Sequence, residues 1–237
     1  NGQCFPLFWY ENRNTGENTL FEADTEEKSY NINNETVEDL KKKYNTKNIT
    51  CENIFYYIYA VLHHPEYKIL FSNNLSKGLP RIPYVHSYES FIKLSKAGEN
   101  LSGIHINYEK AQPYPVNIKK NNLSLKNKTN EETLYHLKKM RFVNKTDKSS
   151  VRYNTSIIIE NIPIEAYQYQ IGGRSALEWI MDRQSIKVDK DSEIINDPND
   201  FANNTMKNPS YPLNLFKKII TVSLETLKII RSFPTLN

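Results

Sequence analysis

Two consecutive glycines that lead into an amphipathic segment constrain this chain more than any other local feature. Gly172 and Gly173 permit positive φ angles and a close approach of the backbone to another surface. Ser175 and Glu178 follow at the spacing of a capping box, in which each side chain accepts a hydrogen bond from the other residue's backbone N–H. Apolar residues then recur at helical spacing at Leu177, Ile180 and Met181. The sequence predicts a glycine turn followed by a helix packed on the core.

The remaining apolar periodicity predicts a helix-rich chain with a few strands. Helices are expected over residues 36–44, 51–64, 66–77, 88–103 and 212–233, and strands over 5–10, 137–143 and 151–160. We therefore predict an α+β fold, a single helix-rich domain over 1–237 with a small mixed sheet and a long C-terminal helix. The pattern loosens over residues 109–150, and a candidate boundary lies near 109–130. If the chain divides, we expect a helical half, 1–108, and a mixed α/β half, 109–237.

Composition sets only broad limits on function. The chain of 237 residues has 31 Lys and Arg against 27 Asp and Glu, a net charge of +4, which suits a polyanionic partner without requiring one. Two cysteines form neither a disulfide framework nor a zinc site. No signal peptide and no apolar run near 18 residues is present, so we expect a cytoplasmic protein without a membrane partner. Since no initiator Met is present, we expect a piece of a longer polypeptide.

Motifs for catalysis are incomplete. Asn208-Pro209-Ser210-Tyr211 resembles the Asn-Pro-Pro-Tyr motif of adenine methyltransferases, which holds a flipped base, but its third residue is Ser. No glycine-rich cofactor turn follows an apolar strand upstream of it. Asp189-Lys190-Asp191 is better explained as a solvated loop than as a nuclease metal site. We expect no metal, no cofactor and no turnover from this chain.

The stretch 117–152 is strongly basic, with acids only at Glu131, Glu132 and Asp147. DNA recognition needs cations for phosphates and forked donors or amides for base edges, and this stretch offers both. The alternative is a solvated, lysine-rich surface. The candidate DNA contacts here are Lys119, Lys120, Asn121, Asn122, Lys126, Lys128, Lys138, Lys139, Arg141, Lys145, Lys148 and Arg152.

Arg174 is a further candidate outside that stretch. Its place after two glycines suits a contact with a phosphate, or a bidentate contact with O6 and N7 of guanine in the major groove. The alternative is a structural salt bridge that fixes the glycine turn.

Four separated blocks carry a resemblance to a known family. They are residues 51–63 (CENIFYYIYAVLH), 79–83 (LPRIP), 172–200 (GGRSALEWIMDRQSIKVDKDSEIINDPND) and 219–230 (IITVSLETLKII). In this order they resemble the C-terminal specificity region of type ISP restriction–modification enzymes, which are single polypeptides that cut, translocate along and methylate DNA. The resemblance extends from about Cys4 to Leu236 and is weakest over 109–150.

The resemblance implies a target-recognition domain. Such a domain would bind a short asymmetric sequence in double-stranded DNA and position an adenine for the methyltransferase domain. It would be non-catalytic, with the nuclease, motor and methyltransferase domains as its partners in the same polypeptide. Two alternatives remain open: a structural docking module for the methyltransferase domain without DNA contact, and a fragment with methyltransferase or nuclease activity. The resemblance also favours DNA contact by the basic stretch.

Overall fold

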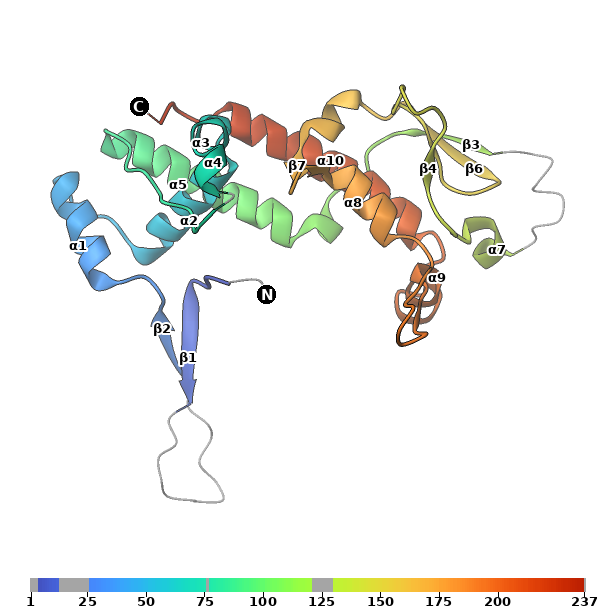
Figure 1. Cartoon of the computed structure of the whole chain (residues 1–237), viewed down its shortest axis with the longest axis horizontal. Coiled ribbons are helices and arrows are strands. Elements are labelled where there is room, and N and C mark those ends of the chain that lie inside the picture. Colours follow the sequence, from blue (N-terminus) through green and yellow to red (C-terminus); the bar gives the residue numbers. More distant parts are fainter. Residues whose placement is uncertain (1–3, 13–25, 76, 121–129, 237) are drawn as a thin grey trace, which may run out of the picture. The chain divides into compact units, whose positions relative to one another are not determined.

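The computed structural model describes residues 4–12, 26–75, 77–120 and 130–236, which fall into two units (Figure 1). Unit 1 comprises Asn1–Ser102 and Ser232–Asn237, and unit 2 comprises Gly103–Arg231. The α+β class, the dominance of helices and the long C-terminal helix are confirmed. The expected mixed sheet differs in one respect, because every strand pair of the described residues is antiparallel. None of the described helices is long and apolar enough to cross a membrane.

Unit 1 is a helical layer preceded by a strand pair. Its elements are β1 (Phe8–Asn12), β2 (Glu26–Tyr30), α1 (Asn34–Lys43), α2 (Cys51–His63), α3 (Pro65–Leu70), α4 (Ser72–Leu75) and α5 (Tyr88–Ile106), the last of which continues into unit 2. A Cβ on Gly98 would lie 1.9 Å from the carbonyl oxygen of Tyr56, so α5 packs directly on the backbone of α2.

The expected helix over 66–77 is interrupted, and this prediction was wrong in its continuity. The helix α3 ends at Leu70 and a separate turn, α4, begins at Ser72. The hydroxyl of Ser72 donates to the carbonyl oxygen of Ile69 at 3.2 Å. Such a local side-chain bond competes with the helical backbone ladder, which accounts for the break.

Unit 2 is built around a four-stranded antiparallel sheet and α10 (Figure 1). The strands lie in the order β3 (Asn117–Lys120), β6 (Ile157–Glu160), β5 (Val151–Arg152) and β4 (Arg141–Phe142). The other elements are η1 (Tyr108–Lys110), α7 (Glu131–Tyr135), η2 (Ile164–Gln168), β7 (Gln170–Ile171), β8 (Arg174–Ser175), α8 (Ala176–Arg183), β9 (Lys187–Val188), β10 (Ile195–Asn196), α9 (Pro198–Asp200), the π-helical turn η3 (Phe201–Thr205) and α10 (Tyr211–Arg231).

The single strand expected over 151–160 is instead a hairpin of β5 and β6. The side-chain oxygen of Asn154 accepts hydrogen bonds from the backbone N–H groups of Ser156 (2.8 Å) and Ile157 (2.9 Å). This Asx turn reverses the chain. The strand expected over 137–143 is also shorter. Asn199 binds both backbone groups of Leu137, and the backbone of Lys138 and Lys139 pairs with Ile186 and Ser185 instead of continuing the sheet.

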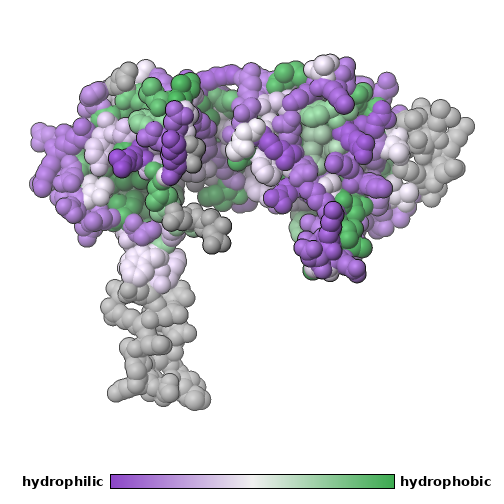
Figure 2. Space-filling view, viewed as in Figure 1, coloured by the Kyte–Doolittle hydropathy of each residue, from purple (hydrophilic) through white to green (hydrophobic). Residues whose placement is uncertain are grey.

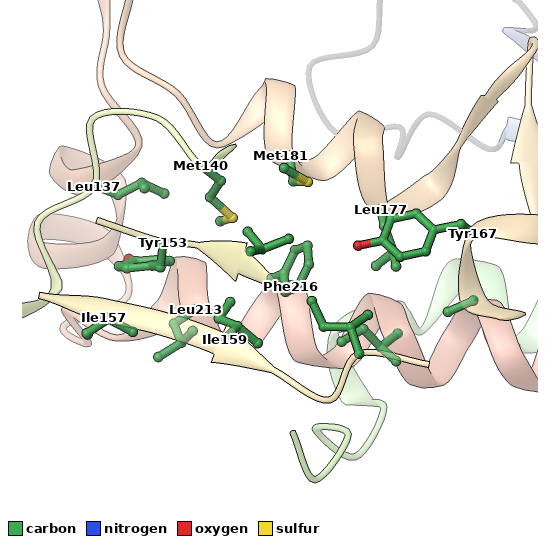
Figure 3. Packing of buried hydrophobic residues seen from close by; sticks show 14 residues of the cluster. Leu137, Met140, Tyr153, Ile157, Ile159, Tyr167, Leu177, Met181, Leu213 and Phe216 are labelled. Carbon is green, nitrogen blue, oxygen red and sulfur yellow. The ribbon is translucent and has the colours of Figure 1, made fainter. Parts of the chain in front are cut away.

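One apolar core joins the sheet, α8 and α10 (Figure 3). Phe216 of α10 is fully buried between Ile159 of the sheet and Leu177 of α8. Burial of each such side chain contributes about 1.5–3 kcal/mol to the free energy of unfolding. The sheet and α8 are therefore held on a common support, which fixes the surface between them.

The predicted glycine turn and capped helix are confirmed. Gly172 and Gly173 have φ angles of 58° and 81°. The N–H of Glu178 donates to the hydroxyl of Ser175 at 3.2 Å, and the N–H of Ser175 donates to the carboxylate of Glu178 at 3.1 Å. From this start α8 places Leu177 and Met181 in the core.

Candidate nucleic-acid interface

The four-stranded sheet is apolar on one face and basic on the other. Residues directly opposite one another on neighbouring strands share a face. The row of Phe142, Val151, Ile159 and Ile118 belongs to the core cluster, whereas the adjacent row on the opposite face consists of Arg141, Arg152, Ile158 and Lys119. With strands about 4.8 Å apart, this second row extends about 14 Å across the sheet.

Arg141 and Arg152 are direct cross-strand partners on β4 and β5. Both are exposed, and no carboxylate forms an ion pair with either guanidinium in the part of the chain that the structure describes. Like charges directly opposite one another destabilise a sheet. The arrangement therefore favours an anion that neutralises both guanidinium groups.

Two hollows adjoin β4 and share Lys139 and Arg141. The first, of about 470 Å³, has no acidic residue in its lining. The second, of about 750 Å³, lies between β4 and α8. We call the cations of these hollows the basic face; they are Lys138, Lys139, Arg141, Lys145, Arg152 and Arg174. In Figure 2, hydrophilic residues cover much of the visible surface of unit 2.

The two carboxylates of the second hollow already have cationic partners. Glu178 accepts from the ammonium group of Lys148 at 2.9 Å, and Asp182 accepts from that of Lys187 at 2.9 Å. Burial alone would raise the pKa of Glu178, but its hydrogen bonds with Lys148 and Ser175 outweigh burial and hold that pKa below its ordinary value. The hydrogen bond from Lys187 likewise lowers the pKa of Asp182. Neither carboxylate therefore neutralises the cations on β4.

Arg174 is held against α8 by several contacts. Its guanidinium carbon lies 4.7 Å from the ring centroid of Trp179, and its Nη2 donates to the carbonyl oxygen of Glu178 at 3.2 Å. Its Nη1 is 3.9 Å from the carboxylate of Asp182, and its side chain remains 45% exposed. Both sequence-based interpretations thus have support: the side chain has structural partners and still lines the second hollow.

Three other predicted contact residues do not line either hollow. Lys148 is engaged by Glu178 and also lies over the rings of Phe142 and Tyr167. Lys119 and Lys120 lie on β3, at the opposite edge of the sheet from β4, and Lys119 is 4.0 Å from the carboxylate of Glu160. Four further predicted residues lie outside the described part of the chain: Asn121, Asn122, Lys126 and Lys128.

Sequence reasoning missed Trp179, Asp182 and Lys187 as partners of this surface. Trp179 and Asp182 are on the helix that the sequence predicted, on the side away from Leu177 and Met181. An aromatic and an acidic residue on the exposed side of a helix next to a predicted arginine were the available signal. Lys187 gave none, because its pairing with Asp182 depends on how the chain leaves α8.

The family model for the type ISP C-terminal specificity domain matches residues 1–215. The chain belongs to this family. A search of the curated proteins finds no match to this chain.

Solved structures of longer chains contain a region similar to this specificity domain. An ATP-dependent type ISP restriction–modification enzyme, LlaBIII, bound to DNA matches 98% of this chain at 34% identity, with a TM-score of 0.78. A nuclease-deletion mutant of the type ISP enzyme LlaGI in complex with a DNA substrate mimic matches 81% at 39% identity, with a TM-score of 0.67. A DrdV–DNA complex matches 98% at 28% identity, with a TM-score of 0.73. The matched regions make up only 14%, 17% and 21% of those chains.

Proposed function

We propose that this specificity domain recognises a short sequence in double-stranded DNA through the basic face of unit 2. The observation that carries the proposal is the unneutralised pair Arg141–Arg152. Both residues line the first hollow, Arg141 also lines the second, and both hollows hold further cations. The similar solved enzymes are bound to DNA or to a DNA substrate mimic, which supports the same ligand here.

The two hollows suit different parts of the ligand. The cations on and beside β4 have no ion-pair partner among the described residues, so they are free to follow phosphates, which position the protein on the duplex. Base edges are read by donors with fixed orientation. The second hollow, in which Arg174 is held by α8, offers such a donor.

Within a longer polypeptide, we propose that the domain is a non-catalytic module. It would hold the target so that an adenine reaches the methyltransferase domain, while the nuclease and motor domains lie in the rest of the chain. The similar enzymes are several times longer than this chain, which supports such a division of labour. Base flipping would then belong to the methyltransferase domain.

The test is a charge-removing double variant, Arg141→Gln with Arg152→Gln. Its affinity for duplex DNA, measured by fluorescence anisotropy, is expected to fall at least about tenfold at moderate salt, because two phosphate contacts are lost. The matched control is Lys93→Gln with Lys228→Gln, which removes the same charge from exposed side chains that do not line the two hollows.

The outcomes separate this proposal from its alternatives. Equal affinity of the double variant and the control would refute the placement of the DNA surface. No DNA binding by the unaltered protein would favour a docking module, and methyl transfer or cleavage by this chain alone would refute the non-catalytic role.

A further inference from the structure

We infer that Arg174 reads a guanine base edge from the second hollow, and that Trp179 and Asp182 are its positioning residues. The inference rests on the proposed function and deepens it, because it separates one base-reading cation from the phosphate-binding cations of the basic face. The side chain of Arg174 is held in place by more contacts than the side chains of Arg141 and Arg152. Arg174 has three contacts with α8, whereas Arg141 and Arg152 have no ion pair or hydrogen bond of the side chain among the described residues.

The restraint on Arg174 begins with its aromatic partner. The indole N–H of Trp179 donates to the carbonyl oxygen of Ile171 at 2.8 Å, which ties the ring to β7. Ile171 and Arg174 are partners in the β7–β8 pair, so the ring that supports the guanidinium is attached to the same turn. A planar cation stacked on an oriented ring keeps a defined plane.

Asp182 acts at the other side of the guanidinium group. Its distance of 3.9 Å from Nη1 is too long for a hydrogen bond, so the ion pair attracts Arg174 without occupying that donor. The tighter partner of Asp182 is Lys187, at 2.9 Å. Of the five N–H donors of Arg174, the bond from Nη2 to Glu178 uses one, and the others have no acceptor among the described residues.

The direction of approach is open. A Cβ added to Gly172 or Gly173 would have no atom within 4 Å, so the turn before Arg174 faces unobstructed space. A phosphate contact requires only a nearby cation and tolerates a mobile side chain. Bidentate recognition of guanine O6 and N7 requires a guanidinium in a set plane with two free parallel donors. The restrained, partly exposed Arg174 matches the second requirement better than the first.

The experiment combines protein variants with one modified base. A binding site is first selected from random duplexes with the unaltered protein, and each guanine is then replaced in turn by 7-deazaguanine, which lacks the N7 acceptor. We expect one guanine at which this replacement weakens binding about tenfold. With Arg174→Met, which removes every donor of the side chain, the same replacement is expected to have no further effect.

Two further variants test the positioning residues, and a third serves as the control. Trp179→Leu and Asp182→Asn are expected to reduce discrimination at that same guanine by several fold, with binding to unrelated duplexes changed less than twofold. The control is Arg183→Met, because the guanidinium of Arg183 is also near the Trp179 ring, at 5.7 Å, but does not line the hollow. Each variant is checked for folding by thermal unfolding.

Two results would overturn the inference in distinguishable ways. If Arg174→Met keeps full discrimination at every guanine, Arg174 does not read a base, although the domain still recognises DNA. If the unaltered protein enriches no sequence, the proposed function itself is wrong and the inference falls with it.

Discussion

The salt dependence of DNA binding follows directly from the basic face. We assign five of its cations to phosphates, namely Lys138, Lys139, Arg141, Lys145 and Arg152. If each neutralises one phosphate, log K falls with log salt at a slope of about −4.5, and removal of Arg141 and Arg152 leaves about −2.7. Between 50 and 200 mM salt, the unaltered protein should lose about 500-fold in affinity and the double glutamine variant only about 40-fold.

The assay is fluorescence anisotropy with a duplex that contains the selected site, titrated at several salt concentrations. Without DNA, the double variant is expected to be as stable as the unaltered protein or more stable by up to about 1 kcal/mol, because cross-strand repulsion between Arg141 and Arg152 disappears. A slope that is unchanged within about half a unit would refute the assignment of these two residues to phosphates.

Three further predictions concern the scaffold that holds this surface. Gly98→Ala should lower the free energy of unfolding by about 1–3 kcal/mol, because the new Cβ would clash with the Tyr56 carbonyl. A Cβ at Gly103 would have no atom within 4 Å, so Gly103→Ala should leave the free energy of unfolding equal or raise it by about 1 kcal/mol. Urea unfolding distinguishes the two outcomes. Ser175→Ala should cost about 1 kcal/mol in the same assay through loss of the helix cap, and an unchanged midpoint would contradict the role of the capping box. The pKa of Glu178 is lower in the folded state, so its carboxylate stabilises the fold above the unfolded-state pKa, and this stabilisation is lost as pH falls through the folded-state pKa. Glu178→Gln should therefore make the free energy of unfolding fall less steeply with pH on the acid side. An unaltered pH dependence there would count against this.

Local signals in the sequence were sufficient where the structure is made by neighbouring residues. The capping box at Ser175 was visible because its hydrogen bonds join residues three apart. The glycine turn was visible because only glycine readily adopts the φ angles found at positions 172 and 173. The long C-terminal helix differed from its predicted bounds by one or two residues at each end.

The arrangement of the basic face depended on contacts between distant residues. Arg141 faces Arg152 because the connection between β4 and β5 sets the register of these two strands, with the side chains of Asn144 and Asp147 accepting from the backbone N–H groups of Thr146 and Ser149. The sequence could therefore place both arginines in a basic stretch but not opposite each other. The ion pair between Lys148 and Glu178, which are 30 residues apart in the sequence, could not be predicted either. The alternation of apolar and polar residues likewise could not predict that residues 151–160 form a hairpin instead of one strand.

Selection of bound duplexes from a random DNA pool, followed by sequencing, tests the central claim most directly. The unaltered chain of 237 residues is compared with the double variant Arg141→Gln, Arg152→Gln. We predict that the unaltered protein enriches one short asymmetric motif, and that the double variant binds a duplex with this motif at least about tenfold more weakly, because two phosphate contacts are lost. Binding without any enriched motif, or equal affinity of both proteins for the enriched duplex, would contradict recognition through the basic face of unit 2.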